Sequence, residues 1–528
     1  MIITSSTTHD QKLSVPIFLL CQVSCKKHKT REIKNMTTLS SLEDLVKSFV
    51  VHGLIATLYM VLTILDVALD ILHNVLQLFL PRPQYENPSA SRNNESPNKK
   101  PTVVIVGANF AGLAALRKLT TKPHLCRVVL IDQRDYFEYT PGILRLFCQP
   151  QHFDRVTKSL VVPKEDSSCC SYEFIQGKVI GLVGDEATSI IPQKVLTYRA
   201  VKRDSSGATY LASSKTTICY DYLILATGAT YPSPIWPMTN ELTLEGRRKG
   251  WQQNHQKLEG TRTITILGAG AVGVELAAEI VYHYGKTKKV ILVDAQESIL
   301  PLFPKAVVEH AMGWLENRGV DIMLGRKLIS WDATKCIFED ESVLEADLVL
   351  NCFGGRANSQ FSQGKGQDFL LTKGRNIAVG TTLQVQVGPI DDGSIFACGD
   401  VASPPTGNEK QAFQAECQAE VAAHNVLALL SGKRPKLKNY PQDLTRNKSD
   451  QMPLVADVSL GPTDGVVVFN ELCIPGPLSA VAKWVLEFTK VMQMQERPCG
   501  ILIWKIADFV VLFLSVHFIR RKGDPKKL

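Results

Sequence analysis

The sequence lacks any cysteine spacing that is typical of a metal site, although the 528-residue chain contains 13 cysteines. Most of them lie singly inside apolar runs, as Cys352, Cys398 and Cys417 do. A thiol in such a run is usually buried and unreactive. We therefore expect no metal site, and we expect the main body of the protein to fold in a reducing compartment.

A basic face for nucleic acid is also missing, despite a formal net charge of +8. Lysine and arginine gather at 26–34, 99–100 and 520–527, and these clusters flank hydrophobic segments. Such placement suits an anionic membrane surface better than a nucleic acid. The first 40 residues contain no clean targeting signal. Because the chain begins Met-Ile-Ile, we expect no N-myristoylation.

No hydrophobic run is long enough to predict a membrane span without ambiguity. Phe49–Leu65 has 17 residues free of Asp, Glu, Lys and Arg, which is the lower limit for a span. The helical pattern continues to Leu80 with one polar stripe. Two alternatives follow: a short span with an amphipathic helix after it, or one long helix lying in the membrane interface. The stripe consists of Asp66, Asp70, His73, Asn74 and Gln77.

The second apolar segment, Gly500–Phe518, contains two charges, Lys505 and Asp508. Each charge near the centre of a bilayer would cost about 2.5–3.5 kcal/mol. Docking in the membrane interface is therefore expected, with the basic residues that follow Phe518 on lipid headgroups. A more amphipathic helix is predicted just before this segment, at Val481–Val491.

Two glycine-rich turns, each between an apolar strand and a helical stretch, are the most informative features present. Each matches the G-x-G-x-x-G pattern of dinucleotide-binding units, fully or nearly so, and an acid ends the next strand. The turn positions are Gly107, Asn109, Gly112, Gly268, Gly270 and Gly273. The acids are Asp132 and Asp294, which lie 25 and 26 residues beyond the first glycine of their turn. Two such units in one chain predict electron transfer from one bound cofactor to another.

The pattern assigns a task to each position of the turn. The first glycine makes the tight turn, the second lets the backbone approach the pyrophosphate, and the third lets the helix pack close to its strand. The phosphates bind at the helix N-terminus, and the acid binds the ribose hydroxyls. The first turn departs from the pattern at Asn109. Because Asn tolerates positive φ better than most residues, we expect this turn to survive, with closer crowding at the pyrophosphate.

Three later segments place small residues at the end of an apolar strand, where a flavin nucleotide can pass close to the backbone. An acid in such a place can accept hydrogen bonds from ribityl hydroxyls. In this order along the chain, the segments predict a flavoprotein. Their key residues are Thr227, Gly228, Gly354, Gly399 and Asp400.

The order of these motifs over residues 101–440 resembles the two-dinucleotide flavoprotein family of pyridine-nucleotide oxidoreductases. Within it, the chain resembles the apoptosis-inducing-factor-homologous, ferroptosis-suppressor-like NAD(P)H:quinone reductases, and next the type II NADH dehydrogenases. The resemblance implies FAD in the first site, NADH in the second and a lipid-soluble membrane quinone as acceptor. NADPH is less favoured, because its 2′-phosphate would meet the carboxylate of Asp294. The segments that carry the likeness are Tyr136–Arg145, Gly268–Glu279, Glu409–Ala415 and Val458–Gly465.

The resemblance also implies roles for single residues. Glu275 would meet the nicotinamide, although a carboxylate at a helix start can simply complement the helix dipole. Lys410 would lie near the flavin or the quinone head, where a cation stabilises the reduced ring; a solvated lysine is the alternative. The implied cofactor-binding residues are Gly107, Asn109, Gly112, Asp132, Arg145, Val179, Thr227, Gly228, Gly268, Gly270, Gly273, Asp294, Gly354, Gly399 and Asp400.

Two other functions stay open. Sulfide:quinone reduction needs a reactive cysteine pair beside the flavin, which Cys352 or the adjacent Cys169–Cys170 would have to supply. A dithiol relay is disfavoured, because Tyr136–Pro150 holds only Cys148 where a C-x-x-x-x-C pair is expected. The second alternative is a redox-sensing flavoprotein that signals through a nucleotide-driven change of shape.

We expect an α/β fold with two Rossmann-like dinucleotide-binding domains and helical membrane-associating ends. The FAD-binding domain is predicted at 101–235 and 375–440, with the NAD(P)H-binding domain inserted at 260–360. The catalytic body is expected on the cytosolic side of a membrane, mitochondrial or of another organelle, and a homodimer is left open. The remaining parts are a leader (1–48), a membrane helix (49–80), a linker (81–100) and a C-terminal membrane-docking region (450–528).

Overall fold

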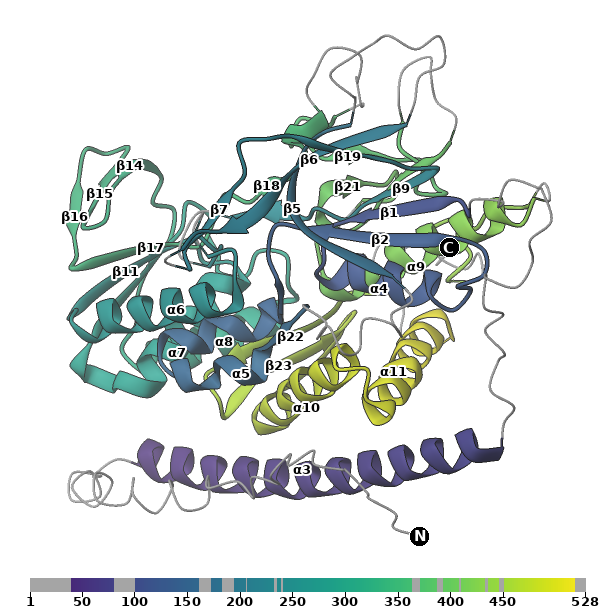
Figure 1. The fold of residues 1–528 in the computed structure, drawn as a ribbon. Helices are drawn as coiled ribbons and strands as arrows, with labels where there is room; N and C mark the ends of the chain where they lie inside the picture. Colours follow the sequence, from purple (N-terminus) through teal and green to yellow (C-terminus); the bar gives the residue numbers. More distant parts are fainter. Residues whose placement is uncertain are drawn as a thin grey trace, which may run out of the picture.

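Each glycine-rich turn follows a strand that is paired in parallel, and the two strands belong to separate sheets (Figure 1). The computed structural model describes residues 39–79, 100–160, 172–182, 194–205, 207–231, 235–238, 241–362, 371–386, 393–407, 410–432, 435–445 and 451–517.

The first sheet is built around β1 (Thr102–Val106), whose five residues are all buried. β1 pairs in parallel with β2 (Arg127–Asp132) on one side and β9 (Tyr222–Leu225) on the other. β20 (Ile395–Ala397) joins β9, although it comes from much later in the chain, and β5 (Glu173–Gly181) joins β2. Strands buried on both faces require continuous apolar runs, and β1 and β2 have them.

Two helices pack together against this sheet, α4 (Phe110–Leu119) and α9 (Ala412–Leu430) (Figure 1). Beyond β5 the sheet turns antiparallel, through β6 (Val195–Arg203), β7 (Thr209–Leu211) and β8 (Thr216–Cys219). The antiparallel strands form the edge of the sheet opposite β20. The parallel strands and the first glycine-rich turn therefore lie in the interior.

The second sheet contains β11 (Thr263–Leu267), β12 (Lys289–Val293), β13 (Asp321–Met323) and β17 (Leu348–Asn351) in the order β13-β12-β11-β17. All of its pairings are parallel. The second glycine-rich turn leads from β11 into α7 (Ala271–Tyr284). The predicted α/β fold with two nucleotide-binding-type sheets is thus confirmed.

Shorter elements surround the two sheets. A small antiparallel sheet of β14 (Leu328–Trp331), β15 (Lys335–Phe338) and β16 (Val343–Glu345) stands at the edge of the second unit, and α8 (Lys305–Glu316) packs beside α7. The remaining short strands are β3 (Tyr136–Glu138), β4 (Thr157–Ser159), β10 (Ala229–Thr230), β18 (Arg356–Ala357), β19 (Ile377–Ala378) and β21 (Ala402–Ser403). The remaining short helices are η2 (Thr140–Phe147), η3 (Pro150–His152), α5 (Phe153–Val156), η5 (Gly285–Thr287), η6 (Gln360–Ser362) and η7 (Gly399–Val401).

The C-terminal part adds a three-stranded antiparallel sheet and two helices. The strands are β22 (Val455–Leu460), β23 (Asp464–Phe469) and β24 (Leu472–Pro475). The helices are α10 (Pro477–Met494) and α11 (Pro498–His517), which pack on each other (Figure 1). α10 also packs on β22 and β23, so the sheet connects it to the rest of the molecule.

The N-terminal hydrophobic segment forms one continuous helix, α3 (Leu39–Phe79), which runs along α10 and α11 (Figure 1). It begins ten residues before the expected boundary at residue 49. Its apolar contacts with α10 join Val51 to Ala480 and Val481. The segment is thus one continuous helix, and the choice between spanning and lying in the interface stays a prediction.

Ionic contacts hold α3 at two points along its length. Near its start, Lys47 Nζ lies 3.5 Å from Asp464 Oδ2. Further along, the buried Asp66 pairs with Arg497 and accepts a hydrogen bond at 3.4 Å from the Cys499 N–H, at the N-terminus of α11. The stripe residue Asp66 therefore faces the protein.

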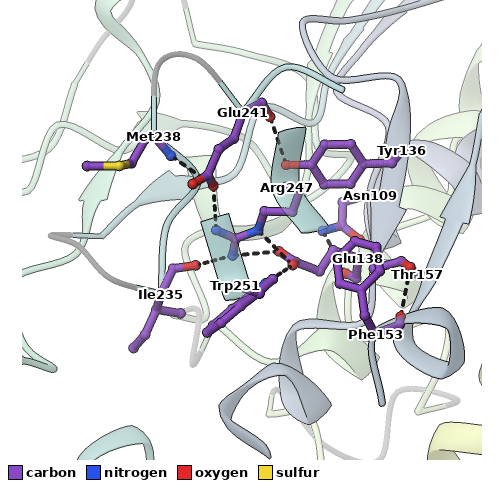
Figure 2. Close-up of polar contacts among 10 residues, drawn as sticks. All are labelled: Asn109, Tyr136, Glu138, Phe153, Thr157, Ile235, Met238, Glu241, Arg247 and Trp251. Carbon is purple, nitrogen blue, oxygen red and sulfur yellow. Dashed lines mark hydrogen bonds and ion pairs between the residues drawn. The ribbon is translucent and has the colours of Figure 1, made fainter. Parts of the chain in front are cut away.

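A buried ionic cluster fixes α6 (Leu244–Glu259), the helix that precedes the second sheet (Figure 2). Arg247 is 1% exposed, and its guanidinium donates to both oxygens of Glu138 at 2.8 and 3.1 Å and to Glu241 at 2.8 Å. The Trp251 indole N–H donates to Glu138 at 3.0 Å. Because Glu138 lies on β3, directly after the first unit's acid strand, the cluster ties α6 to the first nucleotide unit.

Removing the guanidinium would leave two buried carboxylates without their cation. We expect Arg247→Met to lower the free energy of unfolding by about 3–5 kcal/mol, the usual cost of breaking a buried pair. Urea unfolding followed by circular dichroism measures it. Lys249→Met, on the same helix but with a side chain 67% exposed, is the control and should change little. A loss below about 1 kcal/mol for Arg247→Met would contradict the role of the cluster.

Candidate functional site

The two glycine-rich turns have the same backbone geometry. Gly107 and Gly268 have φ of 105° and 101°, a region that favours glycine. A Cβ on Gly112 would lie 1.7 Å from the Gly107 carbonyl oxygen, and one on Gly273 would lie 1.8 Å from that of Gly268. The first and third positions of each turn therefore require glycine for steric reasons that do not depend on a ligand.

The middle positions differ between the two turns. A Cβ on Gly270 would meet nothing within 4 Å, so the N-terminus of α7 is open there. Asn109 has φ of −113°, so the expectation that this turn depends on tolerance of positive φ is wrong. Its side chain instead caps α4 by accepting from the Phe110 N–H at 3.0 Å, and donates to the Glu138 carbonyl at 3.4 Å. The amide thus occupies the helix N-terminus where the pattern has a glycine.

The two acids are held in matching positions by backbone donors. Asp132 accepts from the N–H of Ala108, next to Gly107, at 2.7 Å. Asp294 accepts from the N–H of Ala269, next to Gly268, at 2.6 Å. Each second oxygen accepts from a backbone N–H two residues on, at 2.9 and 2.8 Å. A carboxylate has about four acceptor sites, so each acid keeps capacity to bind ribose hydroxyls.

The segment around η7 also suits a polyol-bearing nucleotide. Gly399 has φ of 74°, and a Cβ there would lie 3.2 Å from the Ala111 side chain, so α4 passes close to the start of η7. Burial raises the pKa of the neighbouring Asp400 carboxyl, and Lys410 opposes that rise. The Tyr231 hydroxyl donates to Asp400 at 3.4 Å. This weak contact leaves Asp400 able to accept further hydrogen bonds, as ribityl hydroxyls require.

The other predicted cofactor residues lie around these two turns. Thr227 donates from its hydroxyl to the Asn358 carbonyl at 2.7 Å, which links the end of β9 to the segment after β18. Gly228 has φ of 66°, and a Cβ there would meet nothing within 4 Å. Gly354 has φ of 86° and is exposed after β17, and Val179 is half-buried within β5.

A small cavity lies where η2, α7, β22 and α10 meet. It joins the segment after the first unit's acid, the helix after the second turn, and the C-terminal part. Most of its wall is polar or charged, which is unusual for an interior site. The lining residues are Pro141, Gly142, Leu144, Arg145, Glu275, Glu279, Ser459, Lys483 and Glu487. We refer to it as the junction cavity.

Arg145 and Glu279 form a buried ion pair in the junction cavity, with 3.2 Å between Nε and Oε1. Burial opposes ionisation of Glu279, but Arg145 and His283 outweigh it and lower the pKa of Glu279 to about 2. Glu279 is therefore a permanent anion at neutral pH, and it keeps the Arg145 side chain turned towards α7.

Glu275 is bound by the C-terminal part of the chain. Its Oε1 accepts from Lys483 Nζ at 2.8 Å and from the Ser459 N–H at 2.9 Å. Sequence reasoning missed Lys483, because a lysine on an amphipathic helix has no signal that separates it from a solvated one. The structure thus brings Glu275 together with Arg145 and with a cation that the motifs did not indicate.

Lys410 lies outside the junction cavity. It precedes α9, with an exposed side chain and φ of 53°. Its charge opposes the rise that burial causes in the pKa of Asp400. Glu275 lines the junction cavity and Lys410 does not. The roles predicted for them, at the nicotinamide and near the flavin or quinone head, stay predictions.

The cysteines provide no reactive pair within the described parts of the chain. Burial raises the pKa of both Cys352 and Cys398 to about 12, so these thiols stay protonated. The adjacent Cys169–Cys170 lie outside the described residues. The described residues also include no group of His, Cys, Asp and Glu that could hold a metal ion.

Comparison with known proteins gives consistent matches. Residues 101–422 match the family described as pyridine nucleotide-disulphide oxidoreductase. Ferroptosis suppressor protein 1 of Xenopus tropicalis is 28% identical over 380 residues, which cover 70% of this chain and 88% of that protein. The alternative NAD(P)H-ubiquinone oxidoreductase C1, chloroplastic/mitochondrial, of Arabidopsis thaliana is 26% identical over 438 residues, covering 75% and 79%.

A solved structure matches in fold alone. NDH2 from Plasmodium falciparum in complex with NADH superposes with a TM-score of 0.54 at 14% sequence identity. The match covers 81% of this chain and 100% of that one.

Two glycines of one turn separate folding from nucleotide binding. Gly273→Ala should lower the free energy of unfolding by about 1–3 kcal/mol, because its Cβ would overlap the Gly268 carbonyl. Gly270→Ala should leave stability within about 0.5 kcal/mol of the wild type but weaken NADH binding, because the methyl group takes the space for the pyrophosphate. Urea unfolding and NADH titration measure the two effects. Equal losses of stability in both variants would contradict this division.

Proposed function

The chain belongs to the pyridine nucleotide-disulphide oxidoreductase family, and we propose that it carries electrons from NADH through FAD to a lipid-soluble quinone. Family members are FAD-dependent oxidoreductases that also bind NAD(P)H. The observation that carries the proposal is the pair of matching turn-and-acid units whose following segments, η2 and α7, line one cavity. The name of the Arabidopsis relative, a ubiquinone oxidoreductase, supports the choice of acceptor.

We assign the first unit to FAD and the second to NADH. Asp132 and Asp400 would bind the hydroxyls of FAD, and the backbone at Gly107, Gly228 and Gly399 would lie along it. When bound, FAD supplies the redox chemistry, by accepting a hydride and passing its electrons on. The FAD-binding domain would comprise 101–235 and 375–440, with the NAD(P)H-binding domain at 260–360 between them.

The second unit would select NADH over NADPH. Asp294 is fixed by the N–H groups of Ala269 and Gln296, so its carboxylate cannot turn away from the ribose position. A 2′-phosphate there would meet a negative charge, whereas a 2′-hydroxyl would donate to it. Gly354, at the end of the second sheet, would leave the backbone close to this nucleotide.

The junction cavity would receive the nicotinamide end of NADH. Glu275 is held by Lys483 and Ser459, so its carboxylate has one orientation before any ligand binds. Arg145, held by Glu279, supplies the opposite charge on the other wall. Such fixed charges act without reorganisation during the reaction. α10 covers this side of the cavity and would exclude water during hydride transfer.

A membrane surface is the proposed source of the quinone. α3 and α11 contain the segments Leu45–Leu72 and Pro498–Ser515, each long and apolar enough to cross a membrane. α3 turns its polar anchors, Lys47 and Asp66, towards the protein and apolar side chains outwards. Among the described side chains of the two helices, the exposed large apolar ones are Leu45, Val46, Phe49, Val50, Leu54, Tyr59, Met60, Val61, Ile64, Leu65, Val67, Ile71, Leu72, Leu502, Ile506, Phe509, Val510 and Phe513.

We propose that α3 and α11 lie in the plane of the membrane interface, with the body on the cytosolic side of a mitochondrial or other organelle membrane. A helix held by ion pairs at two points 19 residues apart cannot tilt to cross a bilayer without breaking one of them. Breaking the Asp66 pair would leave a buried charge unpaired, which costs about 3–5 kcal/mol. The basic residues at 520–527 would bind anionic headgroups.

Anaerobic mixing tests the electron path directly. NADH should bleach the visible flavin absorbance of the purified protein, and a short-chain ubiquinone should restore it. NADPH should bleach it at least tenfold more slowly, because of Asp294. Bleaching without recovery by any quinone would refute the proposed acceptor. Absence of flavin from the folded protein would refute the proposal as a whole.

Charged substitutions on the outer face of α3 test membrane docking. Phe49 and Ile64 are 82% and 69% exposed, and replacing both by Glu should reduce co-flotation with phosphatidylcholine–phosphatidylserine vesicles more than tenfold. Burial of each such side chain is worth about 1.5–3 kcal/mol, and about 1.4 kcal/mol corresponds to tenfold. Leu302→Glu, at a residue 84% exposed on the second unit, should float like the wild type. Equal flotation of all three proteins would contradict the docking surface.

A further inference from the structure

A buried histidine–glutamate pair lies against the junction cavity and has no place in hydride transfer. His152, at the end of η3, and Glu487, on α10, are joined by a hydrogen bond of 2.6 Å between Nε2 and Oε1. Their side chains are 9% and 6% exposed. Glu487 also lines the cavity, and its Oε2 lies 2.5 Å from where a Cβ on Gly142 would be. Because residue 142 is a glycine, Oε2 of Glu487 has space beside the cavity.

We propose that the His152–Glu487 pair delivers the proton that completes reduction of the quinone, an inference that rests on the proposed function. Reduction of a quinone to a hydroquinone adds two electrons and two protons. NADH supplies both electrons but only one proton, as a hydride. The balanced reaction is NADH + H⁺ + quinone → NAD⁺ + hydroquinone, so one proton must come from water through the protein.

His152 and Glu487 can supply this proton themselves once NAD⁺ has left the junction cavity and the quinone head has taken its place. The imidazolium N–H of His152 passes its proton to Glu487, and Glu487 passes one to the quinone oxygen, where an O–H bond forms. A proton from water then restores the imidazolium. The net transfer from an imidazolium to a phenolic oxyanion is favourable, because a phenol is a weaker acid than an imidazolium. No oxidant or reductant besides NADH and the quinone takes part.

Charged groups from several elements surround the pair. Burial opposes ionisation of Glu487, but the hydrogen bond from His152, with Arg145 and Lys483, lowers its pKa. Arg145 pairs with Glu279 and Lys483 pairs with Glu275, both on α7. Burial, and after it Glu487 and Asp457, raise the pKa of Tyr139 just before η2. The carboxylate of Glu487 is thus an acceptor at hydrogen-bond distance from the imidazole of His152.

The position of α10 connects this pair to the proposed membrane surface. Lys483 and Glu487 lie on the face of α10 towards the cavity. On the neighbouring face, the rings of Trp484 and Phe488 have centroids 6.5 and 5.4 Å from that of Tyr59 on α3. One helix therefore separates the cavity from the apolar surface, so the proton donor lies beside the route that a lipid-soluble acceptor would take.

Glu487→Gln tests the proposal, because it keeps the hydrogen-bond acceptor for His152 but cannot carry a proton. In stopped-flow measurements on the FAD-loaded protein, bleaching by NADH should stay within about twofold of the wild type. Reoxidation by a short-chain ubiquinone should slow about 100-fold, as for loss of a general acid. Reoxidation by ferricyanide, which takes an electron and no proton, should be unchanged. Glu309→Gln, at a carboxylate 63% exposed on α8, is the control and should behave as the wild type.

A second readout does not depend on activity. With histidine Cε1 labelled by carbon-13, the NMR signal of His152 is identified by its loss in His152→Gln. This signal should move in Glu487→Gln, because the imidazole loses the carboxylate charge that lies 2.6 Å from its Nε2. An unchanged signal would overturn the proposal.

The outcomes also separate this proposal from the function on which it rests. If quinones fail to reoxidise even the wild type, the proposed function falls. If the wild type is reoxidised and Glu487→Gln equals it, the proton-donor role falls alone. If the variant loses quinone and ferricyanide reactions equally, Glu487 is a structural residue and the proposal is overturned.

Discussion

Charges buried in the junction cavity must be paired, and this constraint fixes how three parts of the chain meet. An unpaired ion in a protein interior costs several kcal/mol, so each charge there needs a partner at hydrogen-bond distance. Glu275 and Glu279 stand one turn apart on α7. One is bound by Lys483 from the C-terminal helix and the other by Arg145 from the segment after the first unit. A shift of any of the three parts would break a pair.

The Arg247 cluster pairs buried charges in the same way just before η2, at Glu138 on β3. There, one guanidinium joins β3 of the first unit to the helix that leads into the second. The segment after β2 is therefore held between two ionic networks, and each network connects it to a different neighbour. Cofactors that exchange electrons need a fixed separation, and a backbone segment held on both sides supplies it.

The sequence predicted those parts of the site that depend on local geometry. The turn glycines and the acids could be identified because a strand, a turn and a helix within about 30 residues determine where each of them lies. The partners of Glu275 and Glu487 could not, since Lys483 and His152 approach from distant parts of the chain. The backbone of Asn109 was misjudged because the positive φ belongs to Gly107, two residues earlier. The sequence left two alternatives for α3, because a charged residue such as Asp66 can end an apolar helix. Its partner, Arg497, is distant in the sequence and becomes apparent only in the structure.

The contact between α3 and the start of α11 joins positions 433 residues apart, at Asp66 and Cys499. A ribosome that adds 5–20 residues per second needs roughly 20–90 s to make the second after the first. Throughout that interval α3 has emerged, with its apolar face and its anchoring acid both lacking their final partners. The ion pair of Asp66 and the contact between α3 and α11 can therefore form only late in synthesis, after both nucleotide-binding units have been made.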